Sequence, residues 1–142
     1  WDSDITEADS PSAEHAGEFE FVSILNVIDR CERPAAVLRS AHSLLQPEGW
    51  LLLATPLPYN AFFYRGPRTA RPSPECTLQL RETSSADGEA AWGQQAAQLL
   101  TDVLPAHGFE PVVFTRLPYL SSGDAETPFW WLDDFVVLAR PV

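Results

Sequence analysis

The chain has 142 residues, of which 9 are Lys or Arg and 20 are Asp or Glu, so its formal net charge is −11 at pH 7. This length predicts one domain that buries about two thirds of its unfolded surface. The acidic balance argues against nucleic acid as a partner, because phosphate binding needs clustered Lys and Arg. The longest apolar run, Trp50–Ala54, is far shorter than the ~20 residues of a membrane span, so no transmembrane segment is predicted.

The start of the chain and its cysteines indicate part of an intracellular protein. The sequence contains no Met and begins with Trp1, which indicates a processed chain or a piece of a longer one. Cys31 and Cys76 lie in different segments, and two thiols do not make a disulfide framework. We expect both to be reduced, as in intracellular proteins, with no compartment or oligomeric state assigned.

The first predicted elements form a strand, a helix and a second strand. Phe19–Ile28 is an apolar run without clean alternation, which is typical of a strand buried on both faces. Pro34 suits a first helical position, and Ala35–Leu45 has helical spacing of its apolar residues. Gln46–Gly49 is expected to end this helix before a buried strand over Trp50–Thr55. Such a unit places its two strands parallel in one sheet.

Pro56–Gly88 is predicted to be a long irregular segment. It holds five prolines and an aromatic cluster formed by Tyr59, Phe62, Phe63 and Tyr64. A loop of this length inside a compact domain is usually functional or mobile. Within it, Cys76–Leu80 is predicted to be a short strand.

The last third of the chain predicts one helix and two strands. Trp92–His107 has helical spacing and is followed by a glycine suited to a left-handed cap. Phe109–Leu117 is predicted to be an edge strand because it contains a proline near its start. After a loop over Pro118–Pro128, Phe129–Leu138 is predicted to be the final strand, antiparallel to its neighbour.

This α/β order, with its terminal antiparallel hairpin, resembles the C-terminal half of the seven-stranded Rossmann-like methyltransferase fold, with strands arranged 4-5-7-6 and flanking helices. Four motifs in the right order resemble the DREV family of methyltransferase-like proteins: Leu25–Cys31 followed by Pro34, Pro56–Tyr59, Thr115–Leu120 followed by Gly123 and Asp124, and Leu132–Asp134 with the closing Pro141 and Val142. The resemblance implies that residues 19–142 are part of a methyltransferase domain, preceded by an acidic, flexible lead-in over residues 1–18.

Family members transfer a methyl group from S-adenosyl-L-methionine to the pros nitrogen (Nδ1) of histidine in His-x-His motifs. The resemblance therefore implies a protein-histidine methyltransferase with proteins of this kind as partners. A Gly-rich turn, which lets the backbone approach the cofactor, belongs to the first half of such a fold. This chain has no G-x-G motif, and none of its seven glycines directly follows the first strand. We therefore expect a C-terminal half that is inactive or weakly active alone, with an unpaired edge on its first strand.

The resemblance places Asn26 and Asp29 against the substrate histidine, and we expect these two residues to be catalytic. Carboxyl ends of strands face the ligand crevice in such sheets, and both residues follow the first strand. The Asn26 amide oxygen would accept a hydrogen bond from Nε2–H. Asp29 would accept one directly or through water, and would stabilise the imidazolium that forms. The alternative is that Asn26 caps a turn while Asp29 pairs with Arg30 or Arg33.

Four further residues are expected to bind the substrate. Trp130 stands where the family has a substrate-facing tyrosine, so the aromatic wall is kept and the phenol hydroxyl is lost. Tyr119 and Arg116 would line a peptide groove, and Tyr59 would belong to an aromatic lid. The alternatives are core packing for the aromatic residues and a surface ion pair for Arg116.

The resemblance implies that Leu25 and Trp1 contact the cofactor, and no metal site is predicted. The three histidines have no metal-ligand spacing with the cysteines. Two rival functions remain open. One is a non-catalytic interaction module that binds a partner through the aromatic loop, and the other is a methyltransferase that acts on a small molecule.

Overall fold

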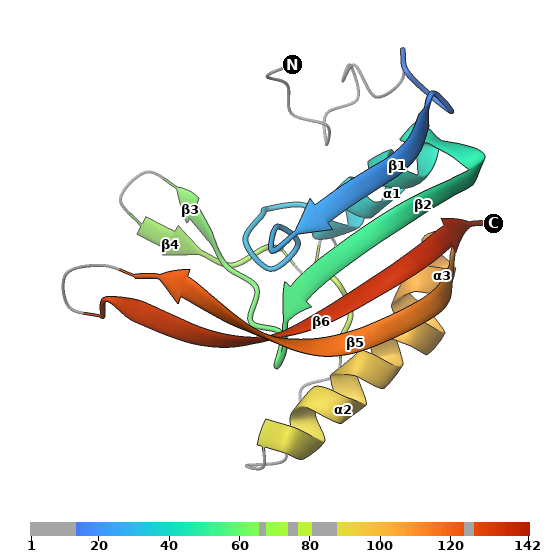
Figure 1. Cartoon of the computed structure of the whole chain (residues 1–142). Helices are drawn as coiled ribbons and strands as arrows, with labels where there is room; N and C mark the ends of the chain where they lie inside the picture. The colour runs from blue at the N-terminus through green and yellow to red at the C-terminus, as the bar shows by residue number, and fades with distance from the viewer. Residues whose placement is uncertain (1–13, 66–67, 74–76, 81–87, 124–126) are drawn as a thin grey trace.

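A computed structural model of the chain describes residues 14–65, 68–73, 77–80, 88–123 and 127–142. The elements follow in the order β1 (Phe19–Leu25), α1 (Pro34–Leu44), β2 (Leu45–Pro56), β3 (Phe63–Arg65), β4 (Arg68–Ala70), α2 (Gly88–Gln98), the π-helical turn η1 (Leu99–Val103), α3 (Leu104–Ala106), β5 (Phe109–Ser122) and β6 (Phe129–Pro141) (Figure 1). The predicted α/β order is confirmed. The β3–β4 hairpin is an addition within the segment that was predicted to be irregular.

Four strands form one mixed sheet in the order β1-β2-β6-β5. The β1–β2 pair is parallel, whereas β6 is antiparallel to both β2 and β5. The register aligns Ile24 with Leu53, Leu53 with Val137, and Val137 with Phe114. This is the expected arrangement of a parallel pair followed by a terminal antiparallel hairpin. β5 lies at the edge of the sheet, as its Pro111 predicted.

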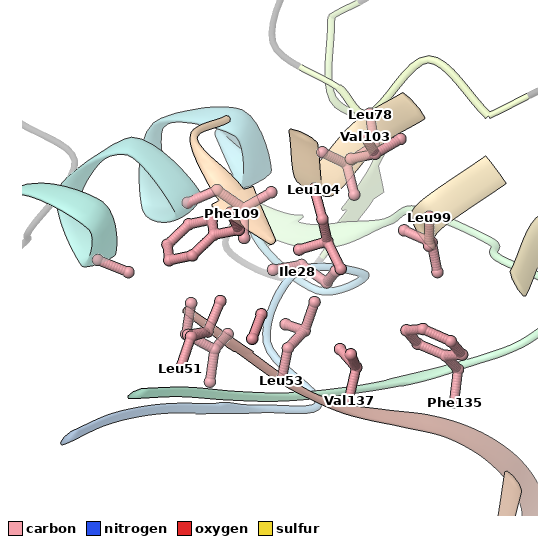
Figure 2. Packing of buried hydrophobic residues seen from close by; sticks show 14 of the residues in the cluster. Ile28, Leu51, Leu53, Leu78, Leu99, Val103, Leu104, Phe109, Phe135 and Val137 are labelled. Carbon is pink, nitrogen blue, oxygen red and sulfur yellow. The ribbon is translucent and has the colours of Figure 1, made fainter. Parts of the chain in front are cut away.

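One face of the sheet packs against all the helices. Figure 2 shows side chains from the sheet meeting those of the helical segments in a single layer, with Ile28 among them. Burial of these apolar side chains is the main force that holds helices and sheet together. Members that are completely buried include Ile28, Leu38, Leu51, Leu53, Leu99, Leu104, Phe109 and Phe135.

The prediction that the first strand runs to Ile28 with both faces buried is wrong. β1 ends at Leu25 because Asn26 adopts a left-handed backbone conformation, with φ of 54°, which turns the chain out of the sheet. Phe21 and Leu25 are 52% and 54% exposed. They are exposed because β1 is an edge strand whose second face meets no helix among the described residues. Ile28 reaches the core from the following turn.

Two predicted connections also differ. Gln46–Gly49 does not separate α1 from the second strand, since β2 begins at Leu45. These residues lie where the β1–β2 register shifts, between the pairs Phe19–Leu45 and Phe21–Trp50, and so form an irregular stretch of strand. Residues 77–80, the described part of the predicted Cys76–Leu80 strand, are not a strand, and Cys76 lies outside the described residues.

The last third of the chain departs from prediction in its lengths. The predicted helix over Trp92–His107 begins earlier and is interrupted by η1. Its end is confirmed, because Gly108 has a φ of 81° and its N–H donates to the Pro105 carbonyl. β5 extends through Pro118, which was predicted to start a loop, as far as Ser122. An edge strand tolerates Pro118 because only one of its sides is hydrogen-bonded to a neighbour.

Candidate functional site

A cleft of about 370 Å³ lies where β1 and β2 end. Its walls come from the turn after β1, the end of β2 and the loop that follows it, β3, and the first half of β6. The lining residues are Asp29, Arg30, Pro56, Pro58, Asn60, Phe62, Tyr64, Trp130 and Leu132. In Figure 1 the β3–β4 hairpin and the free end of the β5–β6 ribbon lie on this side of the molecule. The cleft therefore occupies the usual ligand position of an α/β sheet, beyond the carboxyl ends of its parallel strands.

The turn after β1 holds the two predicted catalytic residues. The Asn26 N–H donates to the Ala54 carbonyl at 2.9 Å, which ties the turn to the end of β2. The Arg30 N–H donates to the Val27 carbonyl at 2.9 Å and closes the turn. The Asp29 carbonyl accepts from the Phe62 N–H, also at 2.9 Å, which joins the turn to the loop before β3. Three backbone hydrogen bonds thus fix the turn in space.

Buried acceptor oxygens are the chemical feature of this turn. Asp29 and Asp134 are each only 4% exposed. Among the described residues, the buried side-chain oxygens that have no hydrogen-bond partner are Asn26 Oδ1, Asp29 Oδ1, Asp134 Oδ1 and Thr55 Oγ1. The Asn26 side chain donates a hydrogen bond to the Asp134 carboxylate. A buried acceptor without a donor costs free energy, so this cluster is suited to a ligand that brings N–H or O–H groups.

The two buried carboxylates influence each other. Burial raises the pKa of Asp29 above its ordinary value, the positive charge of Arg30 opposes this rise, and the negative charge of Asp134 adds to it. Burial also raises the pKa of Asp134, and the hydrogen bond from Asn26 opposes that rise. Arg30 Nε lies 3.3 Å from Asp29 Oδ2, so Asp29 forms the ion pair that was weighed as the alternative to a catalytic role. Its Oδ1 remains available all the same.

Aromatic residues of the loop and of β3 shape one wall of the cleft. The Tyr59 hydroxyl donates to the Ile28 carbonyl at 2.7 Å, and burial raises the pKa of Tyr59, which keeps its hydroxyl protonated. The Phe62 ring packs edge-on against Tyr64, with centroids 5.8 Å apart, and lies 5.2 Å from the Arg30 guanidinium carbon. Tyr59 therefore holds the wall in place from behind, while Phe62 and Tyr64 face the cleft.

The opposite wall comes from β6. Trp130 lines the cleft and is 52% exposed, so it lies on the surface of the protein and not in the core. Leu132, two residues further along, lines the same cleft. A flat group entering here would meet the aromatic rings of Trp130 and Phe62, which both line the cleft.

Other predicted site residues lie elsewhere. Arg116 pairs with Asp133, its Nε donating to both carboxylate oxygens at 2.8 and 2.9 Å, and its Nη1 lies 2.6 Å from Glu89 Oε1. Tyr119 is paired with Leu132 in the β5–β6 ribbon. Neither Arg116 nor Tyr119 lines the cleft, and their contact with substrate stays a prediction.

The two predicted cofactor contacts are also untested. Leu25 is exposed at the end of β1, whereas Trp1 lies outside the described residues. In the part of the chain that the structure describes, no group of three or more His, Cys, Asp or Glu side chains is arranged to hold a metal ion. No helix in that part is long and apolar enough to cross a membrane.

Sequence reasoning did not find Asp134 or Asn60. Asp134 was noticed only as part of a family motif. Its contact with Asn26 joins two residues that are far apart in the sequence, so no local pattern reveals it. Two adjacent Asp residues within the mostly apolar last strand were the available signal, because a buried carboxylate needs a partner.

Two solved methyltransferase structures are similar in fold to this chain. The 1,6-didemethyltoxoflavin N1-methyltransferase of Burkholderia thailandensis, solved with S-adenosylhomocysteine, is 17% identical, with a TM-score of 0.51 over 97% of this chain and 48% of that one. A putative methyltransferase from Bacillus halodurans C-125 is 11% identical, with a TM-score of 0.54 over 99% and 70% of the two chains. The fold is thus the α/β fold, with a mixed sheet, of the Rossmann-like methyltransferases that use S-adenosyl-L-methionine.

The chain belongs to the DREV methyltransferase family, whose model matches residues 5–141. It is also 30% identical, over 96 residues, to the ubiquinone biosynthesis O-methyltransferase of Xanthomonas axonopodis pv. citri. That match covers 65% of this chain and 40% of the relative. The chain therefore spans about half, or less, of the length of the ubiquinone biosynthesis O-methyltransferase and of the toxoflavin N1-methyltransferase.

S-adenosyl-L-methionine is the cofactor of this class, and the described residues fit only part of its site. At the end of β1, the Leu25 side chain is exposed, and Asn26 Oδ1 is buried and has no hydrogen-bond partner. No glycine follows β1 closely enough to bring the backbone against a nucleoside, since Gly49 is the next one along the chain. Neither Asn26 nor Leu25 is among the residues that line the cleft, and the two do not by themselves form a cofactor cradle.

Proposed function

We propose that this chain is the C-terminal part of a seven-stranded methyltransferase that modifies the pros nitrogen of histidine in His-x-His motifs of proteins. The observation that carries the proposal is the pair of partnerless, buried acceptor oxygens, Asn26 Oδ1 and Asp29 Oδ1, in the turn beside the cleft. Residues 19–142 would form the acceptor side of the domain. The cofactor, when bound by the complete enzyme, supplies the methyl group as an electrophile.

A neutral imidazole matches these acceptors. It has one N–H donor and one nitrogen lone pair. If Nε2–H donates to Asn26 or Asp29, the proton is held on Nε2, and Nδ1 keeps the lone pair that must attack the methyl group. Methylation makes the ring cationic, and the nearby Asp29 carboxylate would stabilise that charge. The residues would thus select the tautomer and orient the ring.

The shape of the cleft and the net charge of the chain support an aromatic, basic acceptor. Its volume of about 370 Å³ lies in the lower part of the range of about 300–1,000 Å³ for small-molecule sites. Trp130 and Phe62 provide flat apolar walls. The chain's net charge of −11 favours the approach of a His-rich or basic peptide.

A small-molecule acceptor is the second candidate. The ubiquinone biosynthesis O-methyltransferase and the toxoflavin N1-methyltransferase have names that denote small-molecule chemistry. A substrate hydroxyl that receives the methyl group would also bring an O–H hydrogen-bond donor to the buried oxygens. The two candidates differ in the donor atom and in the need for a peptide.

Titration of the purified chain with a His-x-His peptide at pH 8.5, followed by NMR, tests the proposal. We expect saturable binding with shift changes at Asn26, Asp29 and Trp130. The control peptide carries a methyl group on Nε2 of each histidine, which removes the N–H donor, and it should bind much more weakly. Equal binding of both peptides, or no binding of either, would reject the histidine assignment. If the Asp29→Asn variant binds the first peptide as tightly as the wild-type chain does, the result would favour a non-catalytic interaction module.

A further inference from the structure

The Asn26 side chain can present two different chemical groups to a ligand. Its amide carries an oxygen that accepts and an NH₂ group that donates, and rotation by 180° exchanges them. Only the orientation with the oxygen toward a donor suits an N–H group of a substrate. A residue that fixes this orientation therefore determines what the site can bind.

Asp134 is placed to fix it. The Asn26 amide donates to the Asp134 carboxylate, and an ionised carboxylate can only accept. The opposite amide orientation would set the Asn26 oxygen against a negative oxygen and lose the hydrogen bond. Asn26 Oδ1 is accordingly the partnerless end of the amide.

Asp134 does not line the cleft itself, but it lies on the face of β6 that does. Trp130 and Leu132 line the cleft from β6, and alternate residues of a strand share a face, so Asp134 continues this row. Its partner in the β2–β6 register is Pro56, another lining residue. The carboxylate is 4% exposed and keeps one oxygen without a partner.

We propose that Asp134 is a positioning residue that orients the Asn26 amide so that its oxygen, and not its NH₂ group, accepts from an N–H donor of the substrate. This inference rests on the proposed function and adds to it a residue that acts through Asn26. It makes the site selective for donors. An acceptor group presented to Asn26 by a wrong substrate or a wrong tautomer would meet the amide oxygen and find no donor there.

The amide itself can be observed in the wild-type chain. In a ¹H–¹⁵N spectrum, one Nδ2 proton of Asn26 should be shifted downfield and protected from exchange with water by its hydrogen bond to the carboxylate. In Asp134→Asn the shift and the protection should fall, because the second amide permits both orientations. If both Nδ2 protons of Asn26 in the wild-type chain exchange with water as fast as those of an exposed amide, the inference is overturned.

Binding of the His-x-His peptide supplies the second test. If two orientations become equally populated in Asp134→Asn, the competent fraction is halved and affinity falls at least about twofold. The double variant Asn26→Asp, Asp134→Asn moves the carboxylate to position 26 and the donating amide to position 134. It conserves charge and again leaves position 26 with acceptor atoms only, so we expect wild-type affinity to return.

The outcomes separate the two proposals. Wild-type affinity in Asp134→Asn, with peptide binding intact, overturns the role of Asp134 and leaves the proposed function standing. Failure of the wild-type chain to bind the peptide overturns both. A double variant that is as stable as the wild type, yet binds no better than Asp134→Asn, assigns Asp134 a structural role only.

Discussion

The Tyr59 hydroxyl donates a 2.7 Å hydrogen bond to the carbonyl oxygen of Ile28, and so joins the loop after β2 to the turn after β1. Ile28 is completely buried in the core, while its neighbour Asp29 faces the cleft. The bond therefore connects the packing of the core with the position of the proposed acceptor residues.

Tyr59→Phe should weaken both stability and ligand binding. Loss of a hydrogen bond of this kind costs about 0.5–1.5 kcal/mol of unfolding free energy, which urea denaturation measures. Affinity for the His-x-His peptide should fall as well, because the turn gains freedom. Tyr64→Phe is the matched control for stability, since Tyr64 is 71% exposed and its ring contact with Phe62 does not use the hydroxyl. Equal losses of unfolding free energy in both variants would contradict this role of Tyr59.

Asp29→Asn should stabilise the fold while it weakens binding. Burial raises the pKa of Asp29 in the folded state. The folded chain then holds the proton more tightly than the unfolded chain, so the ionised carboxylate destabilises the fold above its folded pKa. That cost disappears as pH falls through the raised pKa toward the unfolded value. The variant's gain in Tm should be largest near pH 8 and shrink in acid. A gain that grows as the pH is lowered would contradict the assignment.

Phe135 should be among the most costly core residues to truncate. It is completely buried in β6, it stacks on Phe114, and it tilts against Trp92. Phe135→Ala should cost about 3–5 kcal/mol, because it leaves a cavity between sheet and helix. Leu120→Ala, at a position that is 57% exposed, should stay within about 0.5 kcal/mol of wild type. Urea denaturation compares the two, and similar losses would refute the packing described here.

Two glycines should respond to alanine in opposite ways. Gly108 has a φ of 81°, and an added Cβ would lie 2.7 Å from the His42 ring. Strain alone makes Gly108→Ala destabilising by about 1–2 kcal/mol. Gly93 lies inside α2 with open space around it, so Gly93→Ala should stabilise by about 0.5–1 kcal/mol. Thermal denaturation tests the pair, and a shared sign would contradict the geometry at one of them.

Much of the fold could be predicted because it depends on local patterns. The apolar runs gave the four strands of the sheet, Pro34 marked the first residue of α1, and Gly108 was identified as a left-handed cap. The end of β1 was missed because Asn26, and not a glycine, takes the left-handed conformation. The three-residue strands β3 and β4 are too short to show a period.

The candidate site could be predicted only in part. Asp29 and Trp130 were named in advance, and the structure brings both to one cleft. Asp134 was not named, because its role depends on a contact with Asn26 that the topology of the sheet creates. Arg116 was named, yet it lies in an ion-pair network with Asp133 and Glu89, whose formation depends on how α2 packs beside β5.

The central claim is that these residues hold the acceptor while the cofactor cradle lies outside them. Calorimetric titration of the 142-residue chain with S-adenosylhomocysteine tests this directly, with the His-x-His peptide titration confirming that the preparation is folded and competent. We predict no detectable heat of binding for S-adenosylhomocysteine. Saturable binding in the micromolar range would show that this chain builds a usable cofactor site, and would contradict the division of roles proposed here.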